Sequence, residues 1–86
     1  MNINELIVNV KKKLKKNINI ENIIIEDKTF LHKNHSGHLS NRFHLKISIV
    51  SDELKHLSKI DSNKKIYKIL DEELKNHIHS LQILIN

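Results

Sequence analysis

The chain has 86 residues, a length that forms one small domain with a modest core. It contains no cysteine, which excludes disulfides and thiolate metal ligands of its own, and no apolar run exceeds three residues, which excludes a membrane-spanning helix. The net charge of +5 rests on 14 lysines and one arginine, and we interpret most of it as solvated surface, because arginine reads bases and phosphates better than lysine.

The first segment predicts an amphipathic helix over residues 3–16. Its apolar residues recur at spacings of four, three and four, which places them on one helical face: Ile3, Ile7, Val10 and Leu14. The lysine-rich end of this helix is interpreted as a solvated terminus, because cations are favourable there. The opening residues lack the features of a signal or transit peptide. We therefore expect a cytoplasmic protein, with an organellar location left open if a preceding targeting segment has been removed.

Two strands with a long connection follow. Residues 20–27 are rich in β-branched side chains and predict the first strand. Residues 28–42 are polar and aperiodic, which predicts a poorly ordered loop that is long for a strand connection. Residues 43–51 alternate between apolar and polar side chains, which predicts a half-buried second strand. The loop and the start of that strand together carry four histidines within thirteen residues: His32, His35, His38 and His44.

Two helices are predicted next. Ser51 is suited to cap a short helix that ends near residue 57, because its hydroxyl can accept a hydrogen bond from the first turn. Ser58 or Asp61 is suited to cap a second helix, which we expect to continue to Lys75.

The final segment predicts a third strand over residues 77–85, with one face formed by His77, His79, Leu81, Ile83 and Ile85. The element order is then α-β-β-α-α-β: an α/β (α+β) arrangement in one domain, with a three-stranded mixed sheet and helices on one face. The first two strands should pair antiparallel, and the last two should run parallel through a right-handed crossover. The parallel pair brings both strand starts to one end of the sheet, so every histidine except His56 is expected to converge there.

This convergence is compatible with several kinds of chemistry. Imidazole is a good zinc ligand, but the H-x2-H-x2-H spacing matches no known zinc motif. Acid–base catalysis is not favoured, because no acidic residue lies between His32 and Val50 and no glycine-rich phosphate loop is present. Each histidine taken singly is also compatible with an ordinary position. For His79, on the expected apolar face, that position is a hydrogen-bonded core histidine.

The chain resembles the BolA family in motifs that occur in a matching order. These motifs are IIIEDKTFLHKNHSGH, FHLKISIVSDELKHLS with His44-Leu45 near its start, KKIYKILDEEL, and IHSLQI with His79. The resemblance extends over nearly the whole chain. It implies a KH-like fold with two parallel strands, which agrees with the topology expected above.

The resemblance implies a partner rather than a reaction, so no enzymatic activity is expected. BolA-like proteins bind monothiol glutaredoxins and share a [2Fe-2S] cluster with them. The chain is thus expected to be a monomer alone, to form a heterodimer with a glutaredoxin, and to hold no cofactor by itself. The family's carboxyl-terminal histidine ligand matches His79, and its loop ligand matches His32 by spacing, with His35 as the rival. His38, His44 and His77 are then expected at the partner contact.

Histidine ligation has chemical consequences in such a complex. The thiolates would come from the glutaredoxin cysteine and its bound glutathione, and this chain would supply two imidazoles. Replacing two thiolates by histidines resembles a Rieske arrangement, which removes negative charge and raises the reduction potential. Imidazoles also protonate near their ordinary pKa of about 6.5, which makes such a site sensitive to acid.

The sequence departs from the family in the region that leads into the second predicted helix, and this bears on the alternative function. The family often has a basic Arg-His-Arg triplet there, whereas this chain has Ser62-Asn63-Lys64, and a GxxG phosphate-clamping loop is absent. The alternative is a KH-like nucleic-acid-binding regulator that would use a basic surface of Lys59, Lys64, Lys65 and Lys68. We expect such binding to be weak and sensitive to salt. No interaction with a membrane is expected.

Overall fold

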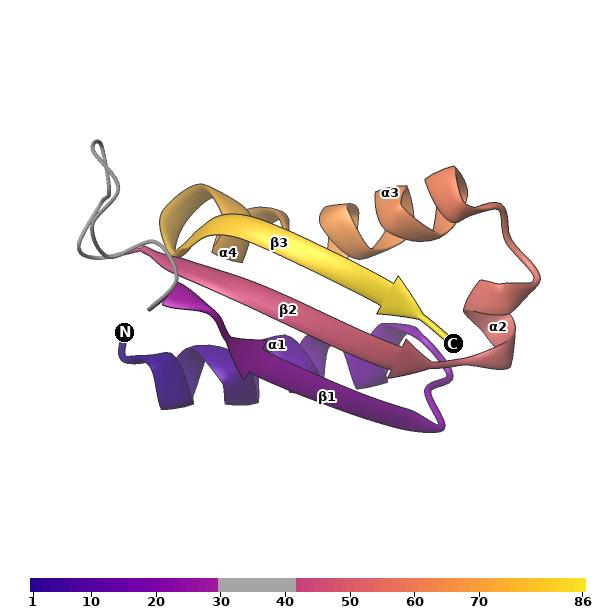
Figure 1. Ribbon diagram of the computed structural model, residues 1–86, viewed down its shortest axis with the longest axis horizontal. Helices are drawn as coiled ribbons and strands as arrows, with labels where there is room; N and C mark the ends of the chain where they lie inside the picture. The colour runs from indigo at the N-terminus through magenta and orange to yellow at the C-terminus, as the bar shows by residue number, and fades with distance from the viewer. Residues whose placement is uncertain (30–41) are drawn as a thin grey trace.

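The structure is a computed structural model that describes residues 1–29 and 42–86 (Figure 1). The predicted loop over residues 28–42 therefore lies mostly outside the described residues. The elements along the chain are α1 (Ile3–Asn17), β1 (Asn22–Asp27), β2 (Phe43–Val50), α2 (Asp52–Lys55), α3 (Lys59–Ile69), α4 (Asp71–Asn76) and β3 (Ile78–Ile85).

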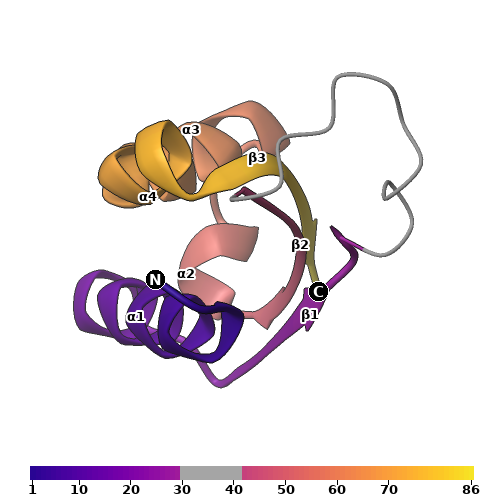
Figure 2. The same ribbon diagram turned by 90° about the vertical axis from the view of Figure 1, so that its left-hand side faces the viewer.

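The three strands form one mixed sheet with β2 in the centre. β1 pairs with β2 antiparallel, and β2 pairs with β3 parallel, so both predicted pairings are confirmed. All helices lie against one face of this sheet, as the end-on view in Figure 2 shows. No helix in the described part of the chain is both long enough and apolar enough to cross a bilayer.

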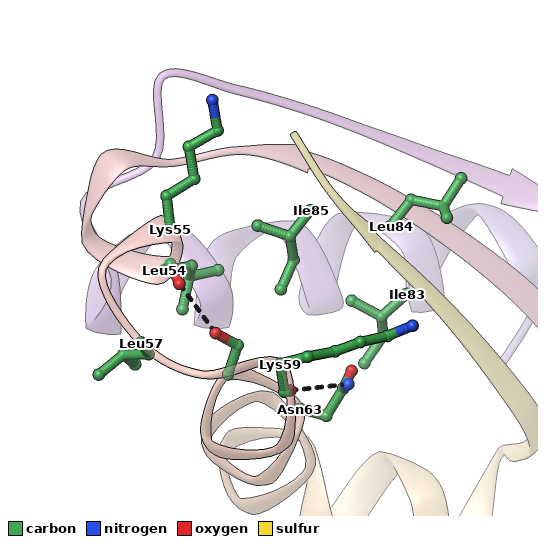
Figure 3. Close-up of a pocket in the computed structure, with 9 residues that line it drawn as sticks. Leu54, Lys55, Leu57, Lys59, Asn63, Ile83, Leu84 and Ile85 are labelled. Carbon is green, nitrogen blue, oxygen red and sulfur yellow. Dashed lines mark hydrogen bonds between the residues drawn. The ribbon is translucent and has the colours of Figure 1, made fainter.

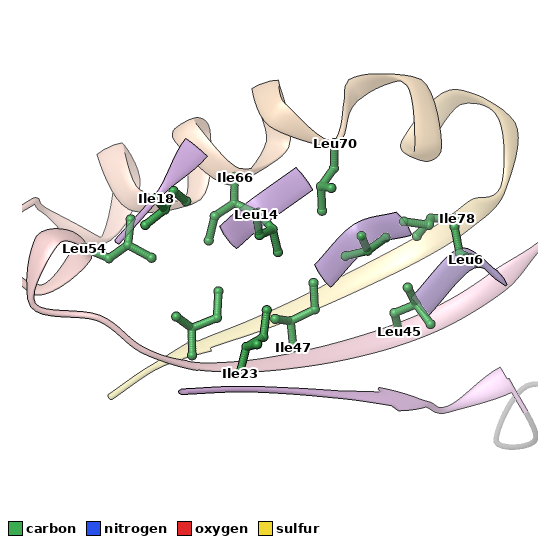
Figure 4. Packing of buried hydrophobic residues seen from close by; sticks show 12 residues of the cluster. Leu6, Leu14, Ile18, Ile23, Leu45, Ile47, Leu54, Ile66, Leu70 and Ile78 are labelled. Atoms are coloured by element: carbon green, nitrogen blue, oxygen red, sulfur yellow. The ribbon is translucent and has the colours of Figure 1, made fainter. Parts of the chain in front are cut away.

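The core lies between the helices and the inner face of the sheet (Figure 4). Alternation along β2 turns Leu45, Ile47 and Ile49 inward, where each is almost fully buried. The helical periodicity of α1 supplies the opposite wall from Leu6, Val10 and Leu14. The remaining buried apolar residues complete one continuous cluster: Ile18, Ile23, Leu54, Ile66, Leu70 and Ile78.

The helical region after Ser58 differs from the prediction of one continuous helix to Lys75. Ser58 caps α3, its side chain accepting from the Asp61 N–H at 3.0 Å, and the helix ends at Ile69. Leu70 leaves helical geometry with ψ of 17°, and α4 begins at Asp71. The sequence after the break favours a new helix start, because three carboxylates follow Leu70 in the first turn of α4, where negative charge is stabilised.

The start of β3 also differs from the prediction. The register shifts between Phe43, which pairs with Ile78, and His44, which pairs with Ser80, so one extra residue is accommodated on β3. As a result Ile78 is buried, whereas His79 is exposed. The expectation that His77 and His79 share the inward face with Leu81 is therefore wrong, because an irregularity of one residue reverses the alternation.

A histidine cluster at the start of the parallel strands

The parallel pairing of β2 with β3 brings the first residues of both strands to one end of the sheet. His44 is the second residue of β2 and His79 is the second residue of β3. Their ring centroids are 4.9 Å apart and their planes are tilted by 51°. His77 ends α4 directly beside them, and its carbonyl accepts from the Phe43 N–H at 2.9 Å. The predicted approach of these three histidines is confirmed.

His44 is held in a nearly buried position. It is 7% exposed, and its Nδ1 lies 2.6 Å from Ser80 Oγ on the neighbouring strand. Ser80 is its register partner, so the contact follows directly from the parallel pairing. The backbone also fixes this residue, because its N–H donates to Thr29 Oγ1 at 3.1 Å and its carbonyl accepts from the Lys28 N–H at 2.7 Å. His44 is thus fixed in the protein through both its ring and its backbone.

His79 has the opposite character, because its side chain is exposed at the same end of the sheet. An exposed imidazole whose ring packs beside a fixed neighbour can present a ring nitrogen to a metal ion or a polar group of a second molecule. Thr29 and Arg42, the described residues that flank residues 30–41, lie at this end as well, since Thr29 contacts His44 and Arg42 precedes β2. Within residues 1–29 and 42–86, no group of three histidine, aspartate or glutamate side chains could hold a metal ion.

The other predicted site residues have different placements. His32, His35 and His38 fall outside the described residues. His56 lies at the carboxyl end of α2, where its Nδ1 is 2.6 Å from the Asp52 carbonyl, so it is separate from the cluster as expected.

The four lysines proposed for nucleic acid are not equivalent. Lys59, Lys64 and Lys68 are exposed on α3. Lys65 instead forms an ion pair with Glu53 at 2.7 Å, which ties α3 to α2. The structure therefore leaves three of the four as an exposed basic set.

Ser80 is the contact that reasoning from the sequence missed. A serine in a strand carries no signal by itself, and its role depends on the register that sets it opposite His44. Thr29 was missed for a similar reason: its hydroxyl reaches His44 only because β1 and β2 pair up to Asp27 and Leu45.

Comparisons with known proteins agree with this arrangement. Residues 14–86 match the family described as BolA-like protein. The chain is 32% identical over 74 residues to the DNA-binding transcriptional regulator BolA of Haemophilus influenzae, covering 86% of this chain and 69% of that protein. It is 27% identical over 78 residues to the chloroplastic protein BOLA1 of Arabidopsis thaliana, covering 87% of this chain and 49% of that protein.

Solved structures show the same similarity. The BolA domain of SufE1 from Arabidopsis thaliana has a TM-score of 0.77 at 29% identity, covering 92% of this chain and 87% of that one. BolA1 from Mus musculus has a TM-score of 0.72 at 19% identity, covering 90% of this chain and 60% of that one, and this similarity supports the fold alone. The sequence match, the α-β-β-α-α-β topology and the fold similarity lead to one conclusion: this chain belongs to the BolA-like family.

Proposed function

We propose that this protein is a non-enzymatic adaptor in iron–sulfur cluster handling, which binds a monothiol glutaredoxin and shares a [2Fe-2S] cluster with it. The observation that carries the proposal is the exposed His79, which lies 4.9 Å from the fixed His44. When two chains share a cluster, the ligand on this chain must be accessible to the cluster that the partner holds. Among the histidines of the described residues near that end, His79 meets this requirement best, because its side chain is exposed.

The proposed ligand set has one member from each of two segments. His79 supplies the first imidazole, and a histidine of residues 30–41 supplies the second, with His32 as the first candidate and His35 as its rival. His38, His44 and His77 would then contact the partner. The short contact of His44 with Ser80 supports a positioning role for His44, whose ring braces that of His79. The glutaredoxin would supply the thiolates from its cysteine and its bound glutathione.

The test is a titration of a cluster-loaded monothiol glutaredoxin with this protein. Visible circular dichroism and size-exclusion chromatography would follow the cluster and the complex together. The proposal predicts a new visible spectrum that saturates at one copy of each chain, because the ligands change when the complex forms. A glutaredoxin spectrum that stays unchanged while the two proteins elute separately would contradict it.

The alternative function is nucleic-acid binding, which the name of the Haemophilus influenzae relative favours. The exposed lysines of α3 also support it, but only as a general electrostatic surface, since α3 carries no arginine. We expect weak binding that is independent of sequence and is lost with rising salt. Lys64→Ala should weaken it more than Lys65→Ala, because Lys65 is already paired with Glu53. Tight binding to one sequence at physiological salt would favour this alternative over the adaptor.

A further inference from the structure

A groove of about 350 Å³ lies at the end of the sheet opposite the histidine cluster (Figure 3). It runs between the turn that joins α2 to α3 and the last residues of β3. Its lining is mainly aliphatic, with Leu54 and Leu57 on the helical side and Ile83, Leu84 and Ile85 on the strand. Leu57 and Leu84 are 38% and 41% exposed, so apolar surface is open to solvent here.

The groove follows the outer edge of β3. Three successive residues of the strand line it: Ile83, Leu84 and Ile85. Neighbouring side chains of a strand point to opposite faces of the sheet, so a groove that contacts all three must follow the edge of the strand. Among residues 1–29 and 42–86, β3 pairs with β2 alone, so no described strand occupies the other side of its backbone. The Tyr67 hydroxyl donates to the Leu81 carbonyl at 3.3 Å on that outer side and so occupies the edge there. By alternation, the N–H and C=O groups of Ile83 and Ile85 point to the same outer side, beyond Tyr67.

The charged side chains among the described residues that line the groove have one sign. Lys55 and Lys59 line it, and none of its lining residues carries a carboxylate. Within residues 1–29 and 42–86, neither lysine forms an ion pair, whereas Lys65, on the same helix as Lys59, is paired with Glu53. Figure 3 shows the Lys59 side chain extended across the groove toward Ile83. The groove therefore combines apolar contacts with two cations that have no anionic partner in the described part of the chain.

This combination favours a peptide over a nucleic acid. Single-stranded nucleic acids are held largely by bases stacked on aromatic rings and by arginine. None of the described residues that line the groove is aromatic or an arginine. Aliphatic walls beside a strand edge instead suit an extended peptide, whose backbone pairs with the edge while alternate side chains enter the groove.

We propose that this groove binds an extended segment of a partner protein in which acidic and aliphatic residues alternate. The segment adds to β3 at Ile83–Ile85, its aliphatic side chains fill the groove, and its carboxylates reach Lys55 and Lys59. Tyr67 limits the added strand at Leu81. His79 and Ile85 are separated by roughly 20 Å, at about 3.3 Å per residue, so both ends of the molecule can be occupied together. The inference does not depend on cluster binding.

The probe for this site is a fluorescent seven-residue peptide, Glu-Ile-Glu-Val-Glu-Leu-Glu, measured by fluorescence anisotropy with the cluster-free protein. The control peptide has lysine in place of every glutamate. The acidic peptide should bind and the basic peptide should not. Rising ionic strength should weaken the binding, because exposed charge contacts are screened. Amide exchange at Ile83 and Ile85 should slow in the complex, since their N–H groups become paired.

The variant Lys55→Glu/Lys59→Glu should weaken binding of the acidic peptide by about tenfold and should create affinity for the basic peptide. Both lysines are exposed, so the fold should be retained, and far-ultraviolet circular dichroism checks this. Lys64→Glu is the matched control, because Lys64 is exposed on the same helix as Lys59 but does not line the groove. The proposal is overturned if the acidic peptide does not bind, if the double variant binds it as wild type does, or if a single-stranded oligonucleotide displaces it from the groove.

Discussion

Two neighbouring histidines have very different environments at the start of the parallel strands. His44 is nearly buried and its ring contacts Ser80, whereas His79 is exposed. The ring–ring distance of 4.9 Å means that the orientation of one restricts the other. Ser80 therefore restricts the ring of His44 directly and the ring of His79 indirectly.

This gives a prediction for Ser80→Ala. The substitution removes the hydroxyl that lies 2.6 Å from His44 Nδ1. The free energy of unfolding should fall by about 1 kcal/mol, because a nearly buried ring nitrogen loses its hydrogen bond. Urea denaturation measures this, and the NMR signals of the two rings should shift together. Gln82→Ala, two residues along the same strand and also exposed, is the control and should change neither observable. Ring signals that stay in place in Ser80→Ala would show that the serine does not orient His44.

At the scale of elements, Lys13 connects the first helix to the last through ion pairs with Glu72 and Glu73, of which the pair with Glu73 is the shorter. Lys13 on α1 lies 2.7 Å from Glu73 on α4, and the Glu73 side chain is only 7% exposed. The hydrogen bond to Glu73 is the main reason that the pKa of Lys13 is raised above its ordinary value. The contact depends on the break at Leu70, which starts α4 as a separate helix.

Lys13→Ala should therefore destabilise the protein by about 1–2 kcal/mol, because it leaves a nearly buried carboxylate without its cation while the lysine itself is partly solvated. Lys12→Ala, a neighbouring exposed lysine, should change stability little. Thermal unfolding of the two variants measures the difference. Equal melting temperatures for both would show that Glu73 tolerates the loss of its partner.

A second connection links the turn before β1 to both α2 and α3 through Glu53. Its carboxylate accepts from the Asn19 N–H at 2.9 Å and pairs with Lys65 at 2.7 Å. The hydrogen bond from Lys65, followed by that from Asn19, lowers the pKa of Glu53 below its ordinary value of 4.5. A lowered pKa stabilises the fold above the unfolded-state value, and this contribution is lost as the pH falls through the folded-state value.

Glu53→Gln should therefore be less stable than wild type at neutral pH, and the difference should narrow as the pH falls below 4.5. Urea unfolding at a series of pH values measures this convergence. A difference that stays constant from neutral pH to acid would show that the ionised carboxylate contributes nothing through its charge.

The elements also show what periodicity can and cannot predict. The pairing of the strands followed from the spacing of apolar residues and the handedness of a connection. The face of α1 followed only in part: Val10 and Leu14 are buried as predicted, but Leu6 is buried in place of Ile7. The break at Leu70 and the register shift at Phe43 did not follow, because both depend on how elements pack together. That shift decides the site: it turns Ile78 inward, exposes His79, and so removes the core position considered for this histidine.

At the scale of the whole molecule, the sheet separates two ends with different chemistry. One end gathers His44, His77 and His79 and is flanked by the residues that precede and follow residues 30–41. The other end holds the aliphatic groove with its two lysines. The central strand β2 connects the two ends, so the two proposed partners would bind at sites separated by the length of the sheet.

The second cluster ligand belongs to this scale, because it depends on how residues 30–41 meet the partner. His32→Ala should shorten the lifetime of the cluster in the glutaredoxin complex, since one imidazole ligand is lost. If His35 can replace His32 as a ligand, His32→Ala should shorten the lifetime less than His79→Ala does. The double variant His32→Ala/His35→Ala should then shorten it as much as His79→Ala does. Decay of the visible absorption measures each lifetime. A double variant that retains the wild-type lifetime would exclude both residues as ligands.

The most direct measurement of the central claim compares His79→Ala with His56→Ala in the complex with a cluster-loaded monothiol glutaredoxin. His79 is exposed, so its loss should leave the fold intact. His56 serves as a histidine control, because it is the C-cap residue of α2 and lies at the end of the sheet opposite the histidine cluster. We predict that His79→Ala changes the visible circular dichroism of the complex and speeds cluster loss, whereas His56→Ala matches wild type. A His79→Ala complex with the wild-type spectrum and cluster lifetime would contradict the assignment of His79 as the ligand.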